Sequence, residues 1–165
     1  MKKPIVIING QGGVGKDEFV KKCSKFLEIK NVSTVDKVKE AYRLLGWNDE
    51  KTEEDRKNLS DIKDLSTKRF DHPFKYISQI IDKFNTIDAH EILFIHSREP
   101  DEINRFKNEF GCITLLIKNQ NVEPINSNHA DANVEKYEYD YIVNNDGTLL
   151  DLENKAFEFL NKINN

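Results

Sequence analysis

The chain has 165 residues, of which 38% are hydrophobic and 33% are charged, a composition that predicts one domain built around one hydrophobic core. Its 25 Lys and Arg residues against 29 Asp and Glu residues leave a formal net charge of -4, which argues against nucleic acid as a partner. The sequence has no apolar run near the roughly 20 residues that span a bilayer, which argues against a membrane partner. We expect a cytoplasmic monomer or homodimer whose two cysteines, Cys23 and Cys112, are buried thiols.

The first 35 residues predict a strand, a loop, a helix and a second strand. Residues 5–8 form a continuous β-branched run, typical of a strand buried on both faces. A glycine-rich loop follows. The helix after it carries its apolar residues on one face, at Phe19, Val20, Cys23, Phe26 and Leu27. A short second strand is expected at residues 32–35.

Residues 36–88 predict a helical insertion that is long for a simple crossover. One helix is expected to end at Gly46, and a very polar stretch follows from residue 52 to residue 70. Another helix is entered through Pro73 in its first turn. An insertion of this length is the natural place for the part of the protein that binds an acceptor substrate.

The second half of the chain continues the alternation of strands and helices. Pro100 is expected to open one helix and Leu149 to begin the closing helix. Residues 118–138 are polar and irregular and are expected to form a lid-like segment. Further strands are expected at residues 92–95, 113–117 and 139–143.

Strands that alternate with helices imply right-handed crossovers and a parallel sheet covered on both faces. The expected fold class is therefore α/β, a three-layer sandwich with a five-stranded parallel sheet. Residues 1–165 are expected to form a single domain that includes the helical insertion at residues 36–88 and the lid-like segment at residues 118–138.

The loop between the first strand and the first helix matches the spacing G-x-x-x-x-G-K. Its glycines let successive backbone N–H groups point into one concavity, and the following helix adds the positive end of its dipole. Lys16 would reach the outer phosphates as a point charge. The predicted binding residues for a nucleoside triphosphate are Gly10, Gln11, Gly12, Gly13, Val14, Gly15, Lys16, Asp17 and Glu18.

Two other interpretations of this loop compete with triphosphate binding. One is a glycine-rich turn without a ligand. The other is a dinucleotide-binding fingerprint, since Gly10, Gly12 and Gly15 also match G-x-G-x-x-G. The lysine in register, and a second strand that is short and polar, favour the triphosphate.

Asp17 occupies a position where most loops of this type carry a Ser or Thr whose hydroxyl binds Mg²⁺. A carboxylate is a hard oxygen donor, so Asp17 is predicted to hold Mg²⁺ directly or through water. The same carboxylate brings negative charge close to the phosphates, which the metal would offset. Alternatively, Asp17 is a first-turn residue that only complements the helix dipole.

The tripeptide Gly15-Lys16-Asp17 resembles the loop of phage-type deoxynucleoside monophosphate kinases and of animal phosphomevalonate kinases, which share the P-loop kinase fold. Three further stretches are similar to these families. They are Ser97-Arg98-Glu99-Pro100-Asp101-Glu102-Ile103, Asp131-Ala132-Asn133-Val134-Glu135, and Tyr139-Asp140-Tyr141-Ile142-Val143-Asn144-Asn145-Asp146-Gly147.

The resemblance implies transfer of the γ-phosphoryl group of ATP, with Mg²⁺, to a small molecule that already carries a phosphate. A (deoxy)nucleoside monophosphate is the first candidate for this acceptor. Arg98 matches the family's phosphate-contacting arginine, so Lys16, Asp17 and Arg98 are the implied catalytic residues. The plainer alternative for Arg98 is a surface arginine paired with Glu99 or Asp101.

Four residues are candidates for binding the acceptor: Asp36, Arg56, Arg69 and Arg98. Arg56 and Arg69 fall on the expected acceptor-binding helices, although charged residues on such helices are commonly solvated. Asp36 follows the second strand, where it would also suit a helix N-cap.

Two departures from the family pattern concern catalysis. His96 stands where the family usually has an acidic residue near the metal, either as a base or as a packed strand-end histidine. In addition, the segment between Lys118 and Lys136 contains no arginine to cover the transferring group. A kinase for a non-nucleotide phosphate and a nucleotide-binding module that transfers nothing therefore stay open as alternatives.

Overall fold

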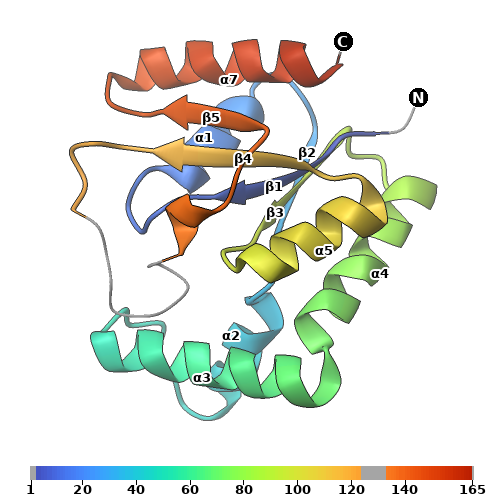
Figure 1. The fold of residues 1–165 in the computed structure, drawn as a ribbon, viewed down its shortest axis with the longest axis vertical. Helices are drawn as coiled ribbons and strands as arrows, with labels where there is room; N and C mark the ends of the chain where they lie inside the picture. Colours follow the sequence, from blue (N-terminus) through green and yellow to red (C-terminus); the bar gives the residue numbers. More distant parts are fainter. Residues whose placement is uncertain (1–2, 124–132, 165) are drawn as a thin grey trace.

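The computed structural model describes residues 3–123 and 133–164 (Figure 1). Five parallel strands form one sheet in the order β2-β3-β1-β4-β5. The strands are β1 (Ile5–Asn9), β2 (Ile29–Ser33), β3 (Ile92–His96), β4 (Ile113–Lys118) and β5 (Tyr141–Asn144). The expected five-stranded parallel sheet is confirmed.

Helices cover both faces of this sheet and make three layers (Figure 1). On one face α1 (Lys16–Cys23) and α7 (Leu149–Asn164) pack over Val6 and Ile8 of β1. On the other face α4 (His72–Thr86) and α5 (Pro100–Phe110) pack over Ile5 and Ile7. Because alternate strand residues point to opposite faces, the β-branched run of β1 supplies both cores, as expected for a strand covered on two sides.

Two helices stand apart from the sandwich below one end of the sheet, α2 (Asp36–Leu44) and α3 (Glu53–Phe70) (Figure 1). Helix α3 buries none of its residues, in keeping with its polar sequence. The predicted insertion spans residues 36–88, but α4, which ends it, belongs to the helical layer because its apolar face packs on the sheet. The part that stands apart is therefore shorter than the sequence suggests.

The bounds of two strands differ from the sequence-based expectation. Strand β2 runs from Ile29 to Ser33 rather than over residues 32–35, because this edge strand is only half-buried and tolerates polar residues such as Lys30. Strand β5 begins at Tyr141 rather than at Tyr139, whose hydroxyl instead bonds to the end of β1. Within the described residues, no helix is long and apolar enough to cross a membrane.

The register of the sheet brings the carboxyl ends of its central strands level. Ile8 of β1 lies opposite His96 of β3, which in turn lies opposite Ser33 of β2. The loops that follow β1 and β3 therefore leave the sheet side by side, at the carboxyl ends of the strands.

Candidate nucleotide-binding site

A crevice is expected where the loops after β1 and β3 diverge. The chain passes from β1 to α1 on one face of the sheet and from the neighbouring β3 to α5 on the opposite face. Ligands of open parallel sheets bind outside the carboxyl ends of the strands at such a switch point. The glycine-rich loop follows β1 and Arg98 follows β3, so the two flank this switch point.

The glycine-rich loop is held in a conformation that other residues do not fit. A Cβ atom at Gly10 would lie 2.5 Å from the carbonyl oxygen of Ile117. Gly15 has a φ of 95°, and a Cβ there would lie 2.4 Å from Nδ2 of Asn145. That amide donates to the carbonyl oxygen of Val14 at 2.9 Å, so the end of β5 fixes the loop from outside. Sequence reasoning missed Asn145, because only the tertiary structure brings it to the loop.

Lys16 begins α1 and folds back over the loop. Its Nζ donates to the carbonyl oxygens of Gly10 at 2.6 Å and Gln11 at 2.9 Å. Helix α1 has Gly15 as its N-cap, with no side-chain hydrogen bond capping this end among the described residues. The ammonium group and the N-terminal N–H groups of α1 thus stand at one place, which suits the phosphates of a nucleotide.

Asp17 and His96 approach each other beside the glycine-rich loop. The Asp17 side chain is 95% exposed, and its Oδ1 lies 3.8 Å from Nε2 of His96. Nε2 also lies 2.9 Å from Oδ1 of Asn31 on β2. Burial lowers the pKa of His96 to about 4, an effect that Asp17 opposes and that Lys16 and Arg98 reinforce. The imidazole is therefore neutral near pH 7 and makes no ion pair with Asp17 there.

The donor atoms near the loop fit Mg²⁺ only as a partner of a bound nucleotide. Among the described residues, no group of three or more His, Cys, Asp or Glu side chains is placed to hold a metal ion. Asp17 offers one solvent-facing carboxylate, and Mg²⁺ commonly pairs one or two carboxylates with phosphate oxygens and water. Asp17 would thus hold the ion from the protein side.

The main chain of Arg98 lies beside the glycine-rich loop. Its carbonyl oxygen accepts a hydrogen bond of 3.3 Å from Nδ2 of Asn9, the residue before Gly10. The neighbouring Ser97 is buried and donates to Oε1 of Glu102 at 2.5 Å, which fixes the start of α5. The structure therefore brings Arg98 to the same edge as Lys16 and Asp17.

The other candidate acceptor residues are divided between α2 and α3. Asp36, at the start of α2, accepts a hydrogen bond of 2.8 Å from the backbone N–H of Ser33 and so stabilises the β2–α2 turn, while Val35 is the N-cap. Arg56 and Arg69 are both exposed and lie at opposite ends of α3, about 20 Å apart at ~1.5 Å per residue. In this arrangement they do not hold one phosphate together.

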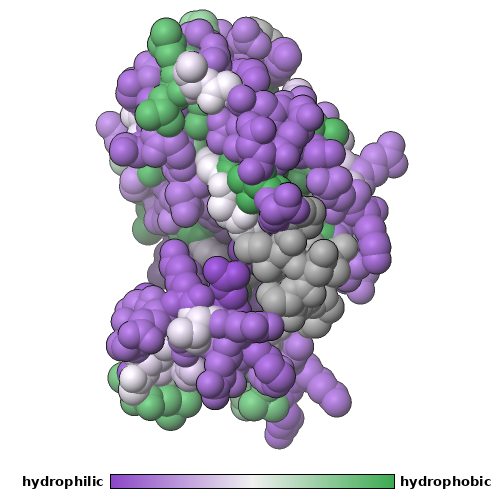
Figure 2. All heavy atoms as spheres, turned by 90° about the vertical axis from the view of Figure 1, so that its left-hand side faces the viewer, coloured by the Kyte–Doolittle hydropathy of each residue, from purple (hydrophilic) through white to green (hydrophobic). Residues whose placement is uncertain are grey.

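A pocket of about 570 Å³ lies between α3 and the start of α5. On the side where β4 and β5 end, the molecule is hollowed between the sandwich and α2–α3 (Figure 2). Arg105 stacks 3.4 Å from the ring centroid of Phe74 and pairs with Asp71 at 2.7 Å. The pocket is lined by Lys63, Asp64, Thr67, Asp71, Phe74, Glu99, Pro100, Asp101, Glu102, Arg105 and Asn133. The sequence analysis did not predict this pocket, because no local pattern links residues of α3, α4 and α5 with Asn133.

Part of the predicted lid falls outside what the structure describes. Of the segment at residues 118–138, residues 124–132 lie outside the described residues, and so do Asp131 and Ala132 of the family-like block. The described remainder includes the short helix η1 (Val134–Lys136), in which Val134 is fully buried.

The fold is similar to solved kinases. A gluconokinase from Sinorhizobium meliloti 1021 matches with a TM-score of 0.52 and 12% identity, over 98% of this chain and 93% of that chain. A shikimate kinase from Aquifex aeolicus vf5 matches with a TM-score of 0.49 and 12% identity, over 96% of both chains. Neither a protein-family model nor a curated protein matches the sequence. The chain has the P-loop kinase fold, and at this level of identity the likeness concerns the fold alone.

Proposed function

We propose that the protein is an ATP-dependent small-molecule kinase. The observation that carries this proposal is the placement of Lys16 over the glycine-rich loop at the N-terminus of α1. Arg98, whose main chain contacts Asn9 next to the same loop, supports it, because transfer of a phosphoryl group needs positive charge around two phosphate groups. Within the P-loop kinase fold, this arrangement suits phosphoryl transfer better than a ligand-free turn.

Each residue has a defined part in the proposed reaction. The loop and α1 would bind the phosphates of ATP, Lys16 would offset charge on the outer phosphates, and Asp17 would hold Mg²⁺, which would shield the phosphates. An acceptor oxygen attacks the γ-phosphorus and gives any proton it carries to water, while the bond from this phosphorus to the oxygen shared with the β-phosphate breaks and ADP leaves with the electron pair. Arg98 orients the group being transferred or a phosphate of the acceptor.

For the acceptor, we propose a small molecule that already carries a phosphate, with a (deoxy)nucleoside monophosphate as first candidate. The resemblance of Gly15-Lys16-Asp17 to kinases of phosphorylated molecules supports this choice, together with the position of Arg98. A phosphomevalonate-like acceptor fits the same requirement.

The pocket beside α5 favours a second candidate, an acceptor that is uncharged or cationic. Its lining includes five Asp and Glu residues but only Lys63 and Arg105 as basic residues. Both basic groups already contact carboxylates, Lys63 with Glu102 at 3.1 Å and Arg105 with Asp71. Carboxylates accept hydrogen bonds from hydroxyl and ammonium groups and repel phosphates.

The test is acceptor-dependent formation of ADP. The protein is incubated with ATP and Mg²⁺, with separate panels of nucleoside monophosphates, other phosphate esters, polyols and amino alcohols. Lys16→Ala should abolish turnover, whereas Lys21→Ala on the exposed face of α1 should not, since its side chain is 76% exposed. Tight ATP binding without ADP from any panel would instead indicate a nucleotide-binding module.

A further inference from the structure

Asn9, the last residue of β1, joins three separate parts of the molecule through one side chain. The residue is fully buried. Its Oδ1 accepts from the backbone N–H of Gly10 at 2.8 Å. Its Nδ2 donates to the carbonyl oxygen of Arg98 at 3.3 Å and to the hydroxyl of Tyr139 at 2.8 Å. The first residue of the glycine-rich loop, the arginine after β3 and the segment before β5 are therefore tied to one amide.

The hydrogen bonds continue from Tyr139 to the short helix η1. The Tyr139 hydroxyl donates to the carbonyl oxygen of Val134 at 2.7 Å, and Val134 is the fully buried first residue of η1. Burial raises the pKa of Tyr139 to about 12, so its hydroxyl keeps its proton and acts as a donor at all ordinary pH values. A continuous path of hydrogen bonds thus runs from η1 to Gly10.

The chemistry of this junction requires an amide at position 9. An Asn side chain offers one oxygen acceptor and two N–H donors, and here the oxygen and the amino group are both engaged. Aspartate has the same shape but lacks donors, so it would set a carboxylate against the Arg98 carbonyl oxygen. Leucine would leave the N–H of Gly10, the carbonyl oxygen of Arg98 and the hydroxyl of Tyr139 without this contact.

We infer that Asn9 is a positioning residue that couples the segment at residues 133–139 to the nucleotide loop and to Arg98. When the loop binds phosphates, any shift of Gly10 is passed through Asn9 to Tyr139 and Val134, and an ordered segment in turn fixes Arg98. The segment lies directly after residues 124–132, so the junction links the described end of the predicted lid to the site.

The experiment measures amide hydrogen exchange of the protein with and without ATP and Mg²⁺. It rests on the proposed function only because ATP is the ligand used. In the wild-type protein, the nucleotide should slow exchange at residues 10–18 and also at residues 97–99 and 133–139. Tyr139→Phe removes only the hydroxyl, so slowing at residues 10–18 should persist while slowing at residues 133–139 is lost. Tyr137→Phe, at the ring that packs 5.0 Å from Tyr139, is the matched control and should behave as wild type.

A second variant and a spectroscopic signature separate coupling from a merely structural role. Asn9→Asp should lose the slowing at residues 97–99 as well, and in Tyr139→Phe the NMR signals of the Asn9 side-chain amide should shift even without nucleotide. Equal slowing at residues 133–139 in wild type and Tyr139→Phe would overturn the inference, as would slowing confined to residues 10–18 in wild type. If the wild-type protein binds no ATP, the proposed function fails. The inference is then tested without ligand: amide exchange at Gly10 and residues 97–99 that is the same in Tyr139→Phe as in wild type would overturn it.

Discussion

Nε2 of His96 lies 3.8 Å from Oδ1 of Asp17 at the carboxyl end of β3. The imidazole is neutral near pH 7, because burial lowers its pKa to about 4. Its contact with Asn31 assigns the proton to Nε2, with Oδ1 of Asn31 as acceptor. The proposed place for Mg²⁺ therefore has one carboxylate and one neutral ring beside it, which leads to two predictions.

Asp17→Asn should weaken binding of ATP in the presence of Mg²⁺ by about tenfold, equivalent to ~1.4 kcal/mol, because a charge-assisted contact to the ion is lost. In the absence of Mg²⁺ the same change should strengthen ATP binding, because a carboxylate no longer repels the phosphates. Isothermal titration calorimetry with and without the metal measures both signs. Asp82→Asn, at an exposed residue of α4, is the control, and equal effects in both conditions would refute a metal-binding role for Asp17.

His96→Asp should lower the Mg²⁺ concentration needed to saturate the ATP complex, because a second hard oxygen ligand then faces Asp17. Without Mg²⁺ it should also lower the melting temperature, since the His96 side chain is only 16% exposed and the new carboxylate would lie close to Asp17. Thermal-shift titrations with Mg²⁺ test both effects. His96→Asn serves as the uncharged control, and a Mg²⁺ midpoint unaltered by His96→Asp would show that position 96 lies away from the metal.

Gly10→Ala should destabilise the protein by ~3 kcal/mol and abolish ATP binding. The added methyl group would lie 2.5 Å from the Ile117 carbonyl oxygen and 2.8 Å from Cγ2 of Val14, so backbone must shift. Gly46→Ala is the matched control: Gly46 has a φ of 107° and no atom within 4 Å of its added Cβ, so only backbone strain of ~1 kcal/mol is expected. Denaturant unfolding and ATP titration compare the two variants. A Gly10→Ala protein that binds ATP normally would contradict the described loop.

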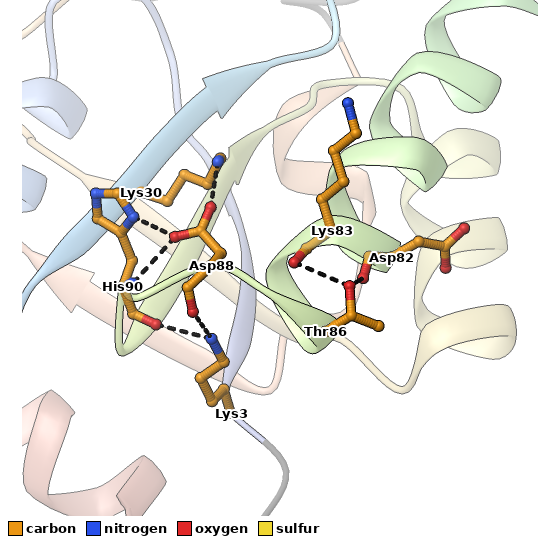
Figure 3. A network of polar contacts seen from close by, with 7 residues as sticks. All are labelled: Lys3, Lys30, Asp82, Lys83, Thr86, Asp88 and His90. Carbon is orange, nitrogen blue, oxygen red and sulfur yellow. Dashed lines mark hydrogen bonds and ion pairs between the residues drawn. The ribbon is translucent and has the colours of Figure 1, made fainter.

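Asp88→Asn should remove a part of the stability that depends on pH. At the end of the sheet opposite the site, the Asp88 carboxylate pairs with Lys30 and His90, and its backbone carbonyl oxygen accepts from Lys3 (Figure 3). Hydrogen bonding to Lys30 and to His90 holds the pKa of Asp88 well below its usual range. The stabilisation is therefore complete above about pH 4 and is lost as pH falls further.

Melting temperatures from pH 7 to pH 2 test this prediction. The wild-type protein should exceed Asp88→Asn at neutral pH, and the gap should close in acid as the wild-type carboxylate takes up its proton. Asp82→Asn, at an exposed residue of α4, is the control and should follow the wild-type curve. A gap that stays constant with pH would show that Asp88 contributes through its shape and not through its charge.

Sequence patterns predicted those features that depend on neighbours along the chain. The β-branched run of β1 and the apolar periodicity of α4 reflect burial that repeats with the geometry of each element, so strands and helices were found with small errors at their ends. Both predicted bounds of β2 were wrong, because an edge strand tolerates polar residues and no local signal in the sequence marks a strand as an edge strand. For Asp36 the alternative of a helix N-cap was wrong, because Val35 is the N-cap of α2 and Asp36 accepts instead from the backbone N–H of Ser33.

The sequence by itself determined the glycine-rich loop with Lys16 and Asp17, because this loop needs only a strand before it, a helix after it and glycines between them. The tertiary structure alone decided which distant side chains meet this loop. Asn145 from the end of β5, His96 from the end of β3 and the Asn9–Tyr139 junction come together because parallel strands end at one edge, whatever their separation in sequence. The structure also places Arg56 and Arg69 at opposite ends of α3. A rise of ~1.5 Å per residue therefore separates two arginines that the sequence analysis had both assigned to acceptor binding.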